Sequence, residues 1–372
     1  MNHKLHVGSR PGLKKSCMAL GLPDDLLWLT FTPEETVFQG IKDFRKAFFG
    51  LLDGKLTVTE IVAKLQLANY DCTLEKVLSI LDFLYEKKLL EDYSANLSGD
   101  NFDHAFGARY SRQALFFGAR EADGIAAADK AMKILNKSHI ILFGMGGFGC
   151  HLLYELASFG IGKITVVDFD QVKASNLNRQ ILFREDDIGN DKVAVGEKIS
   201  ASLNSDIEYH FINKKISAWE EMAEIIEGAD CAILAADSPR GKIFNWMNRA
   251  AFSTNVPTLF SLGVSFKHLR IGPLVIPGKT VCFDCSLPND SINYDDPLIR
   301  HINERHKHGV IGPYVMIAAG MMALELLKHL TGFAPCAIYN QRIDLDLLTY
   351  QTTLVSIVAR HGCPFCEKND CR

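Results

Sequence analysis

Residues 140–149 have the sequence IILFGMGGFG, an apolar run that leads directly into a glycine-rich loop. The apolar residues predict a buried strand, and residues 148–159 predict the helix that follows. Glycines between a strand and a helix allow a tight turn, let the backbone approach a phosphate and direct a helix N-terminus at the anion. Asp168 ends the next apolar run, where a carboxylate accepts hydrogen bonds from ribose hydroxyls. We therefore expect a nucleotide site formed by Gly144, Gly146, Gly147, Gly149 and Asp168.

On both sides of this loop, β-branched apolar runs alternate with helical patterns. The predicted strands are residues 138–143, 163–167, 231–235 and 258–262, and the predicted helices are 148–159, 192–203 and 243–252. Continuous apolar strands between helices indicate a parallel sheet covered on both faces. The fold class that we predict is α/β, with a doubly wound, Rossmann-like domain.

Polar and basic residues follow the second predicted strand. They are Asp170, Asn176, Arg179, Gln180 and Lys192. Asn, Arg and Lys side chains so soon after the strand supply donors for a triphosphate, which carries more charge than the pyrophosphate of a dinucleotide. The pattern favours a nucleoside triphosphate, and a nicotinamide-dependent dehydrogenase remains the enzyme alternative.

The chain has ten cysteines, four of which form two CxxC pairs, Cys282 with Cys285 and Cys363 with Cys366. Two such pairs make a complete tetrahedral thiolate set for Zn²⁺ and leave no ligand position open for catalysis. We expect a structural zinc site that holds the C-terminal segment to the domain. Cys371 is a possible spare ligand that spacing alone does not exclude.

The N-terminal part has a different pattern. Short strands are predicted at residues 26–31 and 36–39, helices at 41–52, 57–65 and 74–86, and a closing strand at 87–91. This order resembles a small winged helix-turn-helix α+β domain. Residues 1–100 contain 12 Lys and Arg against 14 Asp and Glu, without the basic stripe that contacts to nucleic acid require. A module that binds a peptide or protein is favoured over DNA binding, with a purely structural appendage as the alternative.

Composition limits the remaining classes. The 372 residues carry a formal net charge of −4, which argues against a general nucleic-acid or membrane-surface protein. The start lacks the apolar run of a secretory signal, and residues 310–327 fit a buried helix better than a membrane span. We expect a cytoplasmic protein with a domain at 1–95, a polar linker at 96–108 and a second domain at 109–372.

The motifs of residues 109–372 resemble, as a set, those of the E1-like adenylating enzymes, a family that includes ubiquitin-activating proteins and bacterial activators of sulfur-carrier proteins. The motifs are Arg109–Gln113, Gly144–Gly149, Asp168–Asp170, Asn176–Gln180, Lys192, Ala235–Asp237 and the CxxC pairs. The resemblance implies attack of a carboxylate on the α-phosphate of ATP, which gives an acyl-adenylate and pyrophosphate.

The resemblance also implies a role for each matching residue. Asp168 would bind the ribose, Asp237 would position Mg²⁺, and Arg112 would reach across a homodimer into the partner's site as an arginine finger. The ATP phosphates would be held by Asn176, Arg179 and Lys192. Ubiquitin-activating members carry a thioester cysteine after the first CxxC pair, but residues 286–311 contain no cysteine. A thioester relay is therefore not expected, because it would need a distant cysteine such as Cys150 or Cys336.

An E1-like domain without that cysteine, preceded by a small winged-helix-like domain, resembles the peptide-modifying enzymes of microcin C and pantocin A biosynthesis. In that group the N-terminal unit binds the leader of a ribosomal precursor peptide by strand addition. Activation of a Glu side chain, followed by loss of water and CO₂ and cyclisation, is favoured slightly over C-terminal adenylation. A sulfur-carrier activator and a regulator without activity remain alternatives. The His-rich segment 300–308 fits a loop that closes over substrate and a solvated loop equally well.

Overall fold

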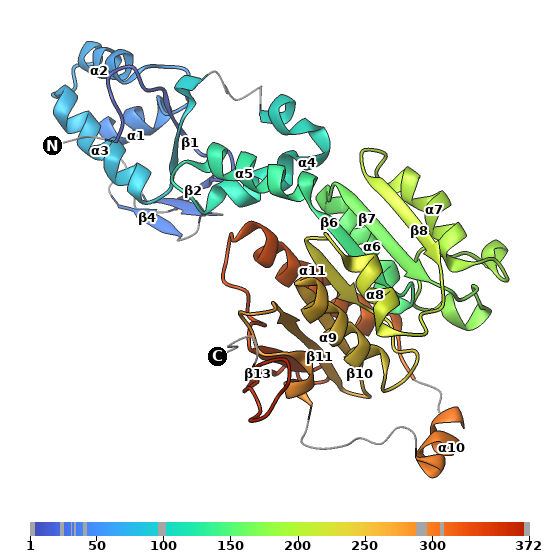
Figure 1. Ribbon diagram of the computed structural model, residues 1–372. Helices are drawn as coiled ribbons and strands as arrows, with labels where there is room; N and C mark the ends of the chain where they lie inside the picture. The colour runs from blue at the N-terminus through green and yellow to red at the C-terminus, as the bar shows by residue number, and fades with distance from the viewer. Residues whose placement is uncertain are drawn as a thin grey trace. The chain divides into compact units, whose positions relative to one another are not determined.

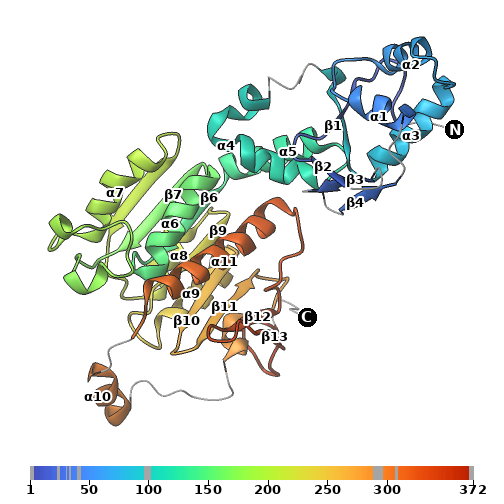
Figure 2. The same ribbon diagram turned by 180° about the vertical axis from the view of Figure 1, so that it is seen from behind.

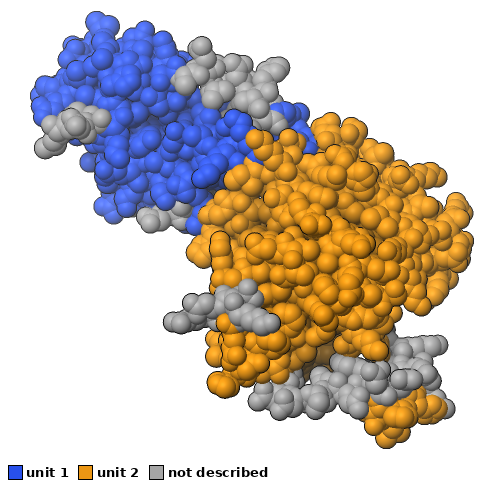
Figure 3. All heavy atoms as spheres, viewed as in Figure 1, with its two compact units in different colours: residues 1–133 blue, residues 134–372 orange. Residues whose placement is uncertain are grey.

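The computed structural model describes residues 4–22, 26–30, 32, 35–39, 43–95, 102–287, 296–305 and 309–367. The chain forms two compact units, residues 1–133 and 134–372, which Figure 3 colours separately. Cys371, residues 96–101 of the predicted linker and residues 306–308 of the His-rich segment lie outside the described residues.

The first unit opens with the α+β domain that the sequence predicts. A three-stranded antiparallel sheet has the order β2-β3-β4, and β1 pairs with β5 in a separate two-stranded sheet. The bounds are β1 Pro11–Leu13, β2 Met18–Leu22, β3 Leu26–Thr30, β4 Thr36–Phe38, α1 Asp43–Gly50, α2 Val58–Leu67, α3 Leu74–Glu86 and β5 Leu90–Asp92. β1 and β2 are absent from the sequence prediction, because both are short and carry no alternating pattern.

The start of α2 shows why local sequence signals succeed here. Thr57 accepts the backbone N–H of Glu60 at 3.2 Å, and Glu60 accepts the backbone N–H of Thr57 at 2.7 Å. This reciprocal capping box satisfies two of the donors that a helix N-terminus leaves free. The buried faces of α2 and α3 then pack against each other in the core of this domain.

Two helices complete the first unit. They are α4 (Phe102–Ala119), which is kinked at Gly107, and α5 (Gly124–Lys137). Ala114 and Ala128, both fully buried, pack at the contact between them. The two compact units thus divide within α5. The linker at residues 96–108 was predicted from a change in composition, and the functional domains on either side of it stay a prediction.

The second unit is built on an eight-stranded sheet of order β13-β12-β11-β10-β9-β6-β7-β8. Strands β10 to β8 are parallel, whereas β11, β12 and β13 extend the sheet antiparallel. The strand bounds are β6 His139–Phe143, β7 Lys163–Asp168, β8 Glu208–Asn213, β9 Cys231–Leu234, β10 Thr258–Val264, β11 His268–Val275, β12 Gln341–Asp346 and β13 Thr352–Ser356. The doubly wound α/β class is confirmed, and the antiparallel extension is an addition that the sequence did not predict.

Helices cover both faces of this sheet. The bounds of these helices are α6 Gly147–Phe159, α7 Lys192–Leu203, α8 Trp219–Ile226, α9 Ile243–Thr254 and α11 Gly312–Thr331, and a further helix of this unit is α10 Pro297–Arg305. α6 contacts both α7 and α11, and α8 packs beside α9. α8 and α9 lie in front of the sheet in Figure 1, and α11 crosses the opposite face in Figure 2.

Within the described residues, α11 is the one helix long and apolar enough to cross a membrane. Ala318, Met322 and Leu326 are buried on it, and the helix packs against α6, β10 and β11. Glu325 is also buried and pairs with Lys328. α11 is therefore a core helix of this fold, as the sequence predicts.

Candidate functional site

A pocket lies where the strand order of the sheet reverses. The chain runs from β6 to β7 and β8 on one side, and then returns to β9 on the other side of β6. Its walls include the carboxyl ends of three strands: Gly144 after β6, Asp168 at the end of β7 and Asp237 after β9. In open α/β sheets this switch point is where ligands bind.

The glycine-rich loop is held tightly against its own helix. Gly144 has φ +99°, which favours glycine, and it lies against the backbone of Ala235. A Cβ on Gly149 would lie 1.8 Å from the carbonyl oxygen of Gly144. Asp168 fixes the loop from the other side, because its carboxylate accepts the N–H groups of Met145 at 2.5 Å and Asp170 at 2.8 Å. The loop is thus rigid before any ligand arrives.

A buried lysine supplies positive charge to this pocket. Lys192, at the start of α7, is 4% exposed, and its Nζ lies 3.1 Å from Asp170 and 4.0 Å from Asp168. A buried ammonium rarely persists without such partners. The Lys192 ammonium lies between two carboxylates, and it can exchange these ion pairs for contacts with the phosphate oxygens of a ligand.

The structure brings together most of the predicted site residues. The pocket is lined by Gly144, Gly146, Asp168, Asp170, Lys192 and Asp237. Gly147 and Gly149 lie beside it in the first turn of α6. The stem of Arg179 is close to Gly147, since a Cβ on that glycine would lie 3.5 Å from the Arg179 Cγ. The segment that holds Arg179 therefore lies beside the loop without lining the pocket.

Two residues that were expected to contact phosphate, Asn176 and Arg179, are engaged with other groups of the chain. The side-chain Oδ1 of Asn176 accepts the backbone N–H of Lys173 at 3.0 Å, and the Arg179 guanidinium donates to the Ser175 carbonyl at 2.8 Å. Gln180 is 3% exposed, and its Oε1 accepts no hydrogen bond within the described part of the chain. Arg112 is exposed on α4 in the first unit, so its role across a dimer stays a prediction.

Sequence reasoning missed two polar residues of the pocket, Lys214 and Ser238, whereas Phe169 lies within the predicted Asp168–Asp170 motif. Lys214 follows the edge strand β8 and pairs with Glu221 on α8 at 3.3 Å. No local motif marks it, because its position depends on how an edge strand ends beside the site. Ser238 directly follows the Ala235–Asp237 motif, so its place in the pocket could have been predicted from that motif.

The cysteines outside the CxxC pairs are poor candidates for a thioester. Cys150 is fully buried beneath the pocket, and burial raises its pKa to about 12. Burial also raises the pKa of Cys336 to about 12. A thiol reacts as its thiolate, so raised values oppose nucleophilic use. This agrees with the absence of a cysteine in residues 286–311.

The four predicted zinc ligands come together in a buried cluster. Cys282 Sγ lies 3.7 Å from Cys285 Sγ and 3.5 Å from Cys363 Sγ, and Cys285 Sγ lies 3.8 Å from Cys366 Sγ. A tetrahedron with Zn–S bonds of about 2.3 Å has edges of about 3.8 Å, whereas a disulfide joins sulfurs about 2.05 Å apart. The Arg360 N–H also points at Cys285 Sγ at 3.3 Å, as outer hydrogen bonds to metal-bound thiolates do. The donor set fits Zn²⁺.

We expect Cys363→Ser to lose the metal, because three thiolates and a hydroxyl bind Zn²⁺ far more weakly than four thiolates. Elemental analysis of purified protein checks this, with about one zinc per chain for the unchanged protein and close to none for the variant. Cys17→Ser is the matched control, since Cys17 lies outside the cluster. Equal zinc content in both variants would contradict the assignment.

The parallel sheet, the braced glycine loop and the cation-bearing pocket at the switch point define a nucleotide-binding α/β enzyme. Comparison with known families makes the class specific: the ThiF family model matches residues 110–365, so the chain belongs to the ThiF family. Its E1-like character is thereby confirmed, and the chain is an ATP-dependent adenylating enzyme.

Curated relatives support the same class. The sulfur carrier protein ThiS adenylyltransferase of Escherichia coli is 29% identical over 69% of this chain and 94% of its own length. The molybdopterin-synthase adenylyltransferase of the same organism is 26% identical over 69% of this chain and 95% of its own length. The family model leaves residues 1–109 unmatched.

Solved structures match nearly the whole chain. Crystal structures of MccB from Escherichia coli superpose with a TM-score of 0.76 at 23% identity, covering 96% of this chain and 99% of that chain. MccB was solved with ATP, and the microcin C7 biosynthetic enzyme MccB was solved in complex with N-formylated MccA. PaaA matches with a TM-score of 0.71 at 22% identity over 92% of this chain. At these identities the likeness establishes the fold.

Proposed function

We propose that this enzyme activates a carboxylate on a ribosomally made precursor peptide, whose leader is bound by the domain at residues 1–95. The observation that carries this proposal is the fold likeness to MccB over 96% of the chain, which reaches beyond the ThiF family match at residues 110–365. The sulfur carrier protein ThiS adenylyltransferase of Escherichia coli matches 69% of this chain, and the ThiF family model begins at residue 110, so the N-terminal domain is the feature that favours a peptide substrate. MccB itself was solved in complex with N-formylated MccA.

In the proposed reaction, a peptide carboxylate oxygen attacks the α-phosphorus of ATP, the bond to the β-phosphate breaks, and pyrophosphate leaves. Lys192 and Arg179 neutralise charge that develops on the phosphate oxygens, and Asp168 accepts hydrogen bonds from the ribose. Asp237 would hold Mg²⁺, which supplies further neutralisation of the phosphates. Arg112 of a second copy would complete the site in a cytoplasmic homodimer.

Within this proposal the activated group is a Glu side chain, as the resemblance to pantocin A maturation implies. A carbon of the peptide would then attack the activated carbonyl carbon and expel AMP, so that a carbon–carbon bond forms with the net loss of one water, and a carboxyl group would leave as CO₂. Adenylation of a peptide C-terminus is the second candidate, favoured by the fold likeness to the microcin C7 enzyme MccB. Neither side-chain activation nor C-terminal adenylation needs a thioester, so both agree with the raised pKa values of Cys150 and Cys336.

Intact-mass spectrometry tests the proposal. A short peptide encoded beside this gene is incubated with the full-length enzyme, ATP and Mg²⁺. Loss of water, or of water and CO₂, supports activation of a side chain, and a gain of the mass of AMP supports C-terminal adenylation. An unchanged peptide, with ATP consumed only when a carrier protein ending in Gly-Gly is added, would overturn the peptide proposal in favour of a sulfur-carrier activator.

A further inference from the structure

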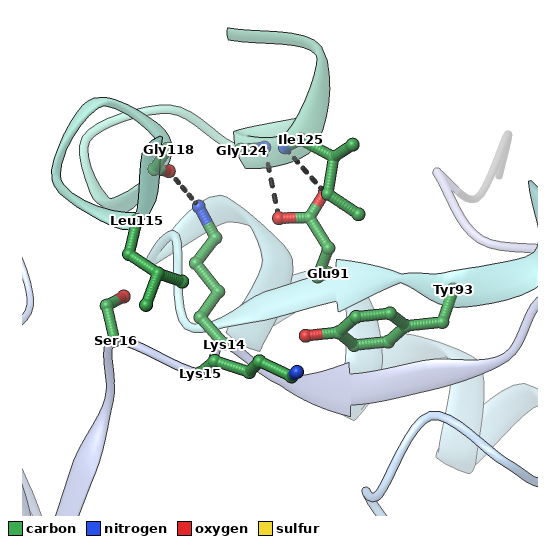
Figure 4. Close-up of a pocket in the computed structure, with 9 residues that line it drawn as sticks. All are labelled: Lys14, Lys15, Ser16, Glu91, Tyr93, Leu115, Gly118, Gly124 and Ile125. Carbon is green, nitrogen blue, oxygen red and sulfur yellow. Dashed lines mark hydrogen bonds between the residues drawn. The ribbon is translucent and has the colours of Figure 1, made fainter. Parts of the chain in front are cut away.

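A buried pair of opposite charges lies in the first unit, apart from the nucleotide pocket. Lys14 follows β1 and is 5% exposed, and Glu91 lies in β5 and is 6% exposed. Gly12 pairs with Glu91 in the β1–β5 ladder, and side chains alternate along a strand, so Lys14 and Glu91 share one face of this small sheet. Figure 4 shows both side chains pointing at the turn between α4 and α5.

Each charge meets the helix end of opposite polarity. Lys14 Nζ donates to the Gly118 carbonyl at 2.9 Å and to the Glu121 carbonyl, at the C-terminal end of α4. The Glu91 carboxylate accepts the N–H groups of Gly124 at 3.1 Å and Ile125 at 3.3 Å, at the N-terminal end of α5. A cation at a helix C-terminus and an anion at a helix N-terminus are both stabilising.

The start of α5 lies close against both the end of α4 and the Glu91 carboxylate. A Cβ on Gly124 would lie 2.5 Å from the Gly118 carbonyl oxygen and 2.6 Å from a Glu91 carboxylate oxygen. The two helices also pack directly, with Ala114 and Ala128 both fully buried. The Lys14–Glu91 pair therefore fixes α4 and α5 as one body to the β1–β5 sheet.

We propose that Lys14 and Glu91 are positioning residues that hold α4, and with it Arg112, in one orientation relative to the β1–β5 sheet. This inference rests on the proposed function, in which the N-terminal domain binds the leader peptide and Arg112 acts on ATP. Arg112 lies six residues before Gly118, about 9 Å along the helix that Lys14 holds. α5 in turn runs to Lys137 and is followed at once by β6, the strand that leads into the glycine-rich loop.

The electrostatics of the pair give it a pH dependence. Burial raises the pKa of Glu91 to about 7, against the opposing effect of Lys14, and burial lowers the pKa of Lys14. The other titratable groups that act on the pair are Glu121, Asp123, Lys88, Tyr85 and Tyr93.

Because the folded protein holds the Glu91 proton more tightly than the unfolded chain, Glu91 contributes stability that is full below about pH 4.5 and is lost as pH rises through about 7. We expect the melting temperature of the unchanged protein to fall over this range relative to that of Glu91→Gln, which has no proton to lose. Parallel melting curves for the two proteins would contradict a protonation role for Glu91.

Hydrogen exchange on the full-length protein tests the joint itself, at pH 8 and without any ligand. In Lys14→Met and Glu91→Leu, which remove the donor and the acceptors, we expect amides at the end of α4 and the start of α5 to exchange about tenfold faster, with rates in α2 and β7 unchanged. Lys14→Arg keeps the donors and should restore slow exchange. The matched controls are Lys133→Met and Asp129→Asn, which break a surface pair on α5. Unchanged rates at the turn, or equal acceleration throughout the unit, would overturn the inference.

A double-mutant cycle in ATP–pyrophosphate exchange, with the peptide identified by mass spectrometry, tests the link to Arg112. We expect Lys14→Met to lower kcat about tenfold at unchanged KM for ATP, and less than about twofold when Arg112 is already alanine. Equal losses in both backgrounds would refute action through Arg112. If no peptide supports pyrophosphate exchange, the proposed function fails, while hydrogen exchange still decides whether Lys14 and Glu91 hold α4.

Discussion

Replacing Asp237 by asparagine is expected to lower kcat for adenylate formation by about 10²–10³-fold. Asp237 follows β9 at the switch point, is exposed and lines the nucleotide pocket. An amide keeps the shape of the side chain and removes the negative charge that would hold Mg²⁺ against the phosphates. Since no buried group loses a partner, we expect the free energy of unfolding to stay within about 0.5 kcal/mol.

Asp230→Asn is the matched control, because Asp230 lies just before the opposite end of β9 and its amide oxygen can still accept the His139 N–H, now bonded at 2.8 Å. ATP–pyrophosphate exchange measures turnover, and fluorescence anisotropy of a labelled peptide measures peptide binding. We expect peptide affinity to be equal in the two variants. A loss of peptide affinity as large as the loss of turnover would mean that the N-terminal domain is not the peptide-binding part.

Signals that lie within a few residues of one another predicted most of this site. The glycine-rich loop, the Asp168–Asp170 turn and the start of α7 each have a local motif, and the sheet brings their ends to one edge because parallel strands share a direction. The CxxC pairs were also predictable from local motifs, because one Zn²⁺ ion takes four thiolate ligands and so brings two distant segments together. The structure confirms that these cysteines cluster.

What the sequence did not predict depends on contacts between distant segments without a periodic pattern. β12 and β13 extend the sheet antiparallel through register with β11, which no local residue type specifies. Lys14 and Glu91 are 77 positions apart in the sequence. Lys14 follows a strand of three residues and Glu91 lies in another, and such strands are too short to show an alternation of apolar and polar residues. Lys214 enters the nucleotide pocket only because β8 is the edge strand beside β7.

Lys192→Met is expected to raise the Kd for ATP about 100-fold, a loss near 2.7 kcal/mol. Lys192 is the buried cation between Asp168 and Asp170, so methionine leaves these two carboxylates without the cation that pairs with both of them. These carboxylates would then repel the triphosphate as well as lose their partner. Calorimetric titration with MgATP measures this effect without a peptide.

The repulsion makes a second variant informative. Adding Asp170→Asn to Lys192→Met removes one of the two uncompensated charges, and we expect it to restore about tenfold of the lost ATP affinity. Lys198→Met, an exposed lysine on the same helix, serves as control and should bind ATP as the unchanged protein does. If the double variant bound no better than Lys192→Met, Lys192 would act only through its own contact with phosphate. If Lys192→Met, the double variant and Lys198→Met all bound ATP normally, the triphosphate would lie elsewhere. A nucleotide phosphate in this pocket would bind more weakly once the buried cation is lost.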